Sequence, residues 1–215
     1  MSIAVLPAKE PPAETRVVLT GIRWSTFEAL AADAPGAGNR FTYDRGVLEI
    51  MSPSLEHEHV KKFLARMIET TTLELDIAIS SAGSTTLKDQ LHERGVEADE
   101  CYYIANEPRI RGKKDIDLAV DPPPDLAVEV DITSTSMGQL GIYAALGVPE
   151  LWLCDGSTIR IYQLRPGGTY SQESRSPAFP LLPMAQVEGF LNDRNAMDET
   201  TWTRRFRDWV RTLTK

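Results

Sequence analysis

The residues of this chain that could do chemistry are acids placed on otherwise apolar strands. The stretch "DLAVEVDI" carries Glu129 and Asp131 among aliphatic neighbours. Residues two apart on a strand share a face and lie ~6.6 Å apart, so both carboxylates can point into one pocket. A carboxylate inside a sheet must lose its charge or find a partner. Glu129 therefore indicates either a functional site or a structural ion pair with an arginine or lysine.

Two further acids could join this pair. Asp99 begins the apolar stretch "DECYYI", although an acidic turn before a strand would look the same. Glu56 lies four residues before Val60, the first member of an apolar helical stripe, and we expect it on the same face. A first-turn glutamate is also favoured by the helix dipole, so a structural role for Glu56 stays open.

A zinc site is a weak alternative. His57 and His59 form an H-x-H pair that His92 could complete. Residues two apart on a helix point about 200° apart, which disfavours chelation of one ion by this pair. Cys101 and Cys154 lie in apolar, strand-like contexts without zinc spacing, so we expect a reduced pair of buried hydrophobic residues.

The elements that must position the acids predict an α/β fold with a mixed sheet. The clearest helix is "SPSLEHEHVKKFLARMIETTTLEL", whose apolar residues follow one face. Shorter helices are expected at "WSTFEALAADAPG" and "STSMGQLGIYAALG", and a hairpin at "RFTYDRGVLEIMS". Strands are expected at "DIAISS", "STTLK", "DECYYI", "DIDLAV", "DLAVEVDI" and "ELWLCDG", followed by a hairpin of "TIRIYQL" and "GTYSQES". The helix at "STSMGQLGIYAALG" makes a strand–helix–strand unit with the strands "DLAVEVDI" and "ELWLCDG".

Length and composition indicate one domain with extensions. We expect a flexible arm over residues 1–19, the main domain over 20–190, and a helix over 191–215 that packs on the domain or on a second subunit. No apolar run approaches ~20 residues and no signal peptide is apparent, so a cytoplasmic protein is expected. The net charge of −8 disfavours broad coating of nucleic acid but leaves room for a local basic groove.

Basic residues gather in two places. The segment "RIRGKKD" follows the Asp99 strand and could grip phosphates beside the acids, or form a solvated loop; its cations are Arg109, Arg111, Lys113 and Lys114. The C-terminal helix carries arginines opposite its aromatic side, a pattern more typical of a solvated face: Arg204, Arg205, Arg207 and Arg211.

A family resemblance follows from four motifs in order. "MSPSLEHEHV", "EADECYYI", "PPPDLAVEVDITSTS" and "IYAALGVPELWLCDG" resemble the Uma-two family of restriction-endonuclease-like proteins, in the PD-(D/E)XK nuclease superfamily. The resemblance covers about residues 20–165. It implies a restriction-endonuclease-like mixed β-sheet core flanked by helices, with Mg²⁺ (or Mn²⁺) held by acids. Asp99 matches the aspartate of the first motif, Glu129 the acid of the second, and Glu56 the acid of the first core helix.

The chain departs from the pattern where a cation is expected. Asp131 occupies the slot that holds a lysine in the wider superfamily, two residues after the second acid. Relatives without it often carry Lys or Arg four residues before the tyrosine; counting back from Tyr143, that residue here is Gln139. A lysine would position the water or neutralise developing charge. Another cation, such as Lys113 or Lys114, could replace it, or the nuclease is weak or inactive.

These observations predict a metal-dependent DNA endonuclease. The expected metal ligands are Glu56, Asp99 and Glu129, and the expected catalytic residues are Asp99, Glu129, Asp131 and Gln139. A homodimer is expected, because the C-terminal helix has an aromatic face and proteins of this fold are often dimeric. One alternative is a catalytically degenerate relative that binds nucleic acid or a protein partner. Another is a structural oligomer whose acids form internal ion pairs.

Overall fold

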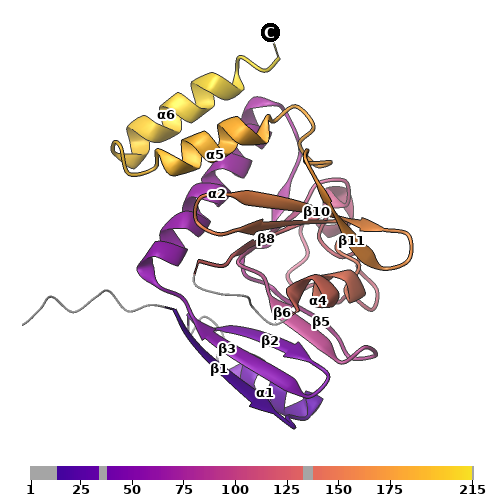
Figure 1. The fold of residues 1–215 in the computed structure, drawn as a ribbon. Coiled ribbons are helices and arrows are strands. Elements are labelled where there is room, and N and C mark those ends of the chain that lie inside the picture. The colour runs from indigo at the N-terminus through magenta and orange to yellow at the C-terminus, as the bar shows by residue number, and fades with distance from the viewer. Residues whose placement is uncertain (1–13, 34–37, 133–137, 215) are drawn as a thin grey trace, which may run out of the picture.

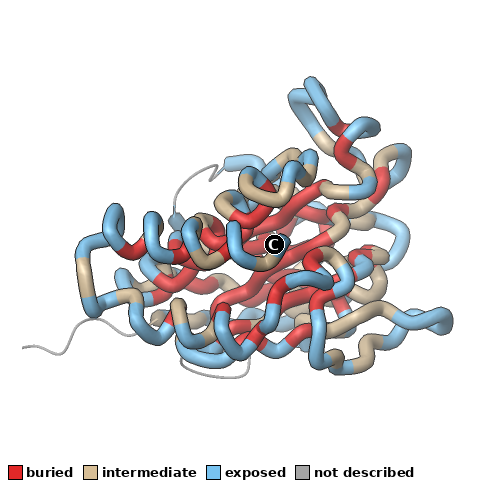
Figure 2. The backbone as a smooth tube through the Cα atoms, turned by 90° about the horizontal axis from the view of Figure 1, so that it is seen from above, coloured by how far each residue is buried: buried red, intermediate tan, exposed pale blue. Residues whose placement is uncertain are grey.

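Two β-sheets and their covering helices make up the fold (Figure 1). A computed structural model describes residues 14–33, 38–132 and 138–214. Buried residues gather in the strands at the middle of the molecule, with exposed turns around them (Figure 2). No helix in the described part of the chain has the length and apolar character needed to cross a membrane. The α/β class with a mixed sheet is confirmed.

The six-stranded sheet, called here the central sheet, has the order β11-β10-β9-β8-β7-β4. Its strands are β4 (Ser80–Ser81), β7 (Glu100–Tyr103), β8 (Leu126–Val130), β9 (Glu150–Cys154), β10 (Ile159–Arg165) and β11 (Thr169–Glu173). β8 and β9 are parallel and the other neighbours are antiparallel. Helix α4 (Gln139–Ala145) lies between β8 and β9 in the chain, which confirms the predicted strand–helix–strand unit.

The alternation along β8 assigns its residues to two layers. Leu126, Val128 and Val130 belong to the apolar cluster beneath the long helix. Ala127 belongs to a second cluster, with residues of α4. Glu129 shares the parity of Ala127, so it lies on the α4 side of the sheet.

Three helices cover the other face of the central sheet. They are α2 (Leu55–Glu74), α5 (Met184–Asn192) and α6 (Glu199–Val210). The side chain of Ser54 accepts a hydrogen bond from the His57 backbone N–H and caps α2. The ring of Trp202 on α6 meets Phe63 of α2 edge-on, with the centroids 4.7 Å apart. The aromatic side of the C-terminal helix is thus buried within its own chain, and the homodimer stays a prediction.

The second sheet is antiparallel and has the order β1-β3-β2-β6-β5. Its strands are β1 (Thr15–Thr20), β2 (Arg40–Asp44), β3 (Val47–Ser52), β5 (Thr86–Asp89) and β6 (Arg94–Glu97). One face packs on α1 (Trp24–Asp33) through a cluster that includes Phe27 and Tyr43. On the other face, Val96 belongs to the same cluster as Tyr143 of α4, so α4 lies between the two sheets.

Three local predictions are wrong. The segment "DIDLAV" is a turn, because the carboxylates of Asp115 and Asp117 accept backbone N–H bonds within the segment and replace a strand ladder. Of "DIAISS", only Ser80–Ser81 form a strand. The flexible arm expected over residues 1–19 is wrong for 15–19, because this Val- and Leu-rich stretch pairs with β3. The helix predicted from residue 134 starts with residues 134–137, which lie outside the described residues.

Candidate active site

Asp99 and Glu129 lie side by side at one end of the central sheet. Glu100 pairs with Val128 in the antiparallel register, which sets Asp99 beside Glu129. The backbone N–H of Val130 donates to Asp99 Oδ2 at 2.9 Å. Both side chains are buried, at 1 % and 4 % exposure. The sequence predicted this convergence, and we call these two residues the acid pair.

Helix α4 holds Glu129. The Tyr143 hydroxyl donates to Glu129 Oε1, and Gln139 Nε2 donates to Oε2 at 3.4 Å. These donors stand one helical turn apart, so both face the strand. Burial raises the pKa of Glu129 well above its usual range, and the charge of Asp99 raises it further, which the Tyr143 hydrogen bond only partly offsets. The acid pair therefore favours the uptake of a proton or a cation.

Two cations hold Asp99. His57 Nε2 lies 2.9 Å from Asp99 Oδ1, and His57 Nδ1 lies 2.7 Å from Glu14 Oε1. Burial alone would lower the pKa of His57, but hydrogen bonds with the two carboxylates raise it to about 9. At neutral pH the imidazole is thus charged and both nitrogens donate. Arg40 on β2 forms an ion pair with Asp99 at 3.5 Å.

Asp131 belongs to a neighbouring charge network. Arg16 on β1 binds three carboxylates: Glu49 at 2.7 Å, Asp131 at 3.1 Å and Glu14 at 3.3 Å. The slot in which the superfamily has a lysine thus holds an acid that is paired with an arginine from another strand. Through Glu14, this network is continuous with the one around Asp99.

The predicted inward position of Glu56 is wrong. Its side chain is 47 % exposed and forms an ion pair with Arg194, which follows α5. Consecutive helix residues point about 100° apart, so the first turn of α2 presents His57 to the sheet instead. The sequence reasoning considered His57 only for a zinc site and missed its contact with Asp99. Its signal was its spacing three residues before Val60 and seven before Leu64, which places it on the buried stripe.

The two carboxylates of the acid pair suit a hard cation such as Mg²⁺. In the described ranges, no group of three or more His, Cys, Asp or Glu side chains is arranged to hold an ion. Mg²⁺ is commonly bound through one or two carboxylates, with waters and substrate phosphates as the other ligands, and the acid pair offers that donor set. The histidines do not gather, since His57 binds Asp99 while His92 binds Asp89 at 2.6 Å.

The basic segment that follows β7 begins at the end of that strand opposite to Asp99. Asp99 precedes β7, whereas Arg109 stands on α3 (Glu107–Ile110), beyond its far end. Arg111 pairs with Glu107, and Lys113 pairs with Asp121. Across the described residues, no hydrogen bond or ion pair links Arg109, Arg111, Lys113 or Lys114 to the acid pair.

Comparisons with known proteins give a family match and a structural likeness. A family model, Uma2, described as "Putative restriction endonuclease", matches residues 24–191. No curated protein matches the chain. Among solved structures, the chain is similar to a "putative nuclease belonging to DUF820 from Anabaena variabilis ATCC 29413", with a TM-score of 0.49 and 16% sequence identity. That likeness covers 70% of this chain and 90% of the other.

Proposed function

Because the chain belongs to the Uma2 family, described as "Putative restriction endonuclease", we propose that it is a metal-dependent endonuclease that hydrolyses phosphodiester bonds in DNA. The observation that carries this proposal is the buried acid pair, Asp99 and Glu129, at the end of two adjacent strands. The raised pKa of Glu129 supports it, because a pair of like charges is relieved by a cation.

In this proposal, Asp99 and Glu129 would hold Mg²⁺ or Mn²⁺, whose chemistry when bound would be to lower the pKa of a water and stabilise charge on the attacked phosphate. The chain's own residues fix the ligands. The Val130 N–H and His57 orient Asp99, and Tyr143 and Gln139 orient Glu129.

Arg40 is proposed to supply the positive charge that the missing lysine would have given. Its side chain is 12 % exposed, and its Nε, although 3.5 Å from Asp99 Oδ1, makes no hydrogen bond with any described residue. A guanidinium there can donate to a phosphate oxygen as negative charge develops. Asp131 contributes indirectly in this scheme, by holding Arg16 beside Glu14.

Plasmid cleavage with matched variants tests the proposal. The wild-type protein is incubated with supercoiled DNA and Mg²⁺ or Mn²⁺, with EDTA as the blank. Glu129→Gln keeps the shape of the side chain but removes its charge, and we expect cleavage to fall by about 100-fold or more. The control is Glu150→Gln, at a buried acid that accepts hydrogen bonds from Trp152, Ser176 and Ala178 outside the site. Equal cleavage by wild type and Glu129→Gln would reject the assignment.

A second candidate function is a non-catalytic relative that binds nucleic acid or a protein partner. Its support is that Asp99 is already held by His57 and Arg40, and that an acid replaces the lysine. Titration calorimetry separates the two candidates. Mg²⁺ binding that Glu129→Gln abolishes favours the enzyme, and no binding by the wild type favours the non-catalytic protein.

A further inference from the structure

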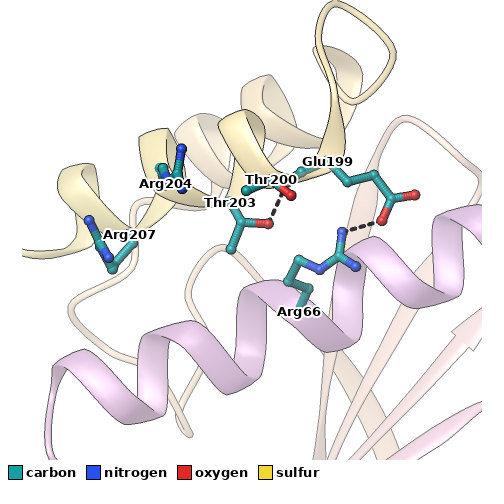
Figure 3. Close-up of a pocket in the computed structure, with 6 residues that line it drawn as sticks. All are labelled: Arg66, Glu199, Thr200, Thr203, Arg204 and Arg207. Atoms are coloured by element: carbon teal, nitrogen blue, oxygen red, sulfur yellow. Dashed lines mark hydrogen bonds and ion pairs between the residues drawn. The ribbon is translucent and has the colours of Figure 1, made fainter.

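A pocket of about 280 Å³ lies between α2 and α6 (Figure 3). It is lined by Arg66 of α2 and by five residues of α6: Glu199, Thr200, Thr203, Arg204 and Arg207. Three arginines and two threonines thus line the pocket, with one glutamate among them.

The α6 residues of this pocket form one face of the helix. Positions 200, 203, 204 and 207 follow the i, i+3, i+4, i+7 spacing. A neighbouring face of the helix buries Trp202, Phe206 and Val210 against the domain. Two of the four arginines expected on a solvated face therefore line a pocket, and Arg66, distant in sequence, joins them there.

The three arginines differ in how far they are already occupied. Arg66 pairs with Glu199 at 2.7 Å, and its guanidinium lies 5.5 Å from the centre of the Phe63 ring, so its position is fixed from two sides. Arg207 pairs with its neighbour Asp208 at 3.0 Å. Arg204 has no hydrogen bond or ion pair with the part of the chain that the structure describes. Its donors are free for a ligand.

We propose that this pocket binds backbone phosphates of duplex DNA at a distance from the acid pair. Arginine suits phosphate because its planar group can donate two parallel hydrogen bonds. Contacts of this kind position a duplex without reading its sequence. Because the net charge is −8, contact with DNA depends on local basic clusters such as this one. The inference rests on the DNA substrate proposed above.

The helix α2 sets the spacing between the pocket and the acid pair. His57 touches Asp99, and Arg66 lies nine residues further along the same helix. At a rise of 1.5 Å and a turn of 100° per residue, the two residues are about 13 Å apart along the helix axis and project from opposite sides of α2.

Neighbouring arginines on α6 provide a matched test. Arg204 lines the pocket, whereas the adjacent Arg205 contacts Met197 Sδ at 3.5 Å. Affinity for a labelled duplex is measured by fluorescence anisotropy in EDTA over a range of KCl concentrations. We expect Arg204→Gln to weaken binding about tenfold at low salt. It should also reduce the slope of log K against log salt by about one, while Arg205→Gln changes neither.

Several outcomes would overturn the proposal. If Arg204→Gln and Arg205→Gln lose duplex affinity equally, only overall charge matters. If the duplex affinity of Arg204→Gln is unchanged, Arg204 does not contact the DNA. Competition by inorganic phosphate is compared with KCl at equal ionic strength. If Arg204→Gln abolishes that competition but leaves duplex affinity intact, the pocket holds a small anion and not DNA. Arg207→Gln serves as a second variant, and thermal melts confirm folding.

The test distinguishes failure of the DNA-contact proposal from failure of the enzyme proposal, because EDTA prevents metal-dependent cleavage while binding is measured. If cleavage depends on Glu129 while Arg204→Gln binds normally, the enzyme stands and the pocket fails. If binding depends on Arg204 while the wild type never cleaves, the pocket stands and the enzyme fails.

Discussion

At the scale of single residues, the site is defined by how its charges are paired. His57 is fully buried between Glu14 and Asp99, and these carboxylates raise its pKa to about 9. A histidine whose pKa is higher in the folded state stabilises the fold when protonated. That stabilisation is complete below pH 6.5, the ordinary pKa, and is lost as the pH rises towards 9.

The free energy of unfolding should therefore fall between pH 6.5 and 9, with His57 contributing at most about 3 kcal/mol of the decrease. Urea denaturation at several pH values in EDTA measures it. The matched variant is His57→Gln, which has no titrating group, so subtracting its curve removes the contribution of other groups. Parallel curves for the two proteins would contradict the assigned charge.

Arg40 is the residue on which the chemistry of the proposed enzyme most depends after the acids. We expect Arg40→Gln to lower kcat about 100-fold with little change in duplex affinity, because its charge acts where charge develops on the phosphate. Arg40→Lys keeps the charge but loses the planar group, and should recover part of the rate. A loss confined to KM for both variants would show that Arg40 only binds substrate. Rates under single turnover separate the two.

At the scale of elements, local periodicity in the sequence predicted the buried faces of helices and strands, whereas the pairing of distant strands could not be predicted. The stripe of α2 from Val60 and the alternation of β8 are local patterns, and both are confirmed. The residue of the first turn of α2 that faces inward was predicted to be Glu56 but is His57. Glu56 was preferred because a carboxylate is a typical Mg²⁺ ligand. Arg16 and Arg40 could not be predicted as partners of the site. Their strands belong to a second sheet whose register depends on contacts distant in sequence.

The packing of α6 on α2 gives a prediction about stability. Trp202 is 1 % exposed, stacks on Phe206, and donates its indole N–H to the carbonyl of Phe190 at 2.9 Å. Trp202→Ala should lower the free energy of unfolding by about 3–5 kcal/mol, since it leaves a cavity and an unsatisfied carbonyl. Trp209→Ala, on the same helix but only partly buried, should cost clearly less. Equal costs in urea denaturation would show that α6 does not pack as described.

At the scale of the whole molecule, an acidic chain concentrates its functional candidates at two places. The acid pair lies where the two sheets meet α4 and the start of α2, and the arginine pocket lies further along α2, under α6. One rigid helix thus connects the proposed chemistry to the proposed duplex contact. This arrangement explains how a protein with a net charge of −8 could still approach DNA, through a restricted basic surface.

The contacts of the first strand have a consequence for folding during synthesis. Glu14 and Arg16 emerge from the ribosome first, yet their partners include His57 and Asp131, the latter 115 residues later. A charge network closed over such distances forms only after most of the chain has been made and folded. A nascent or truncated chain therefore lacks the ordered acid pair. Under the proposed function, a nascent chain gains cutting activity only after β8 has been made and Asp131 has met Arg16, without a separate inhibitor.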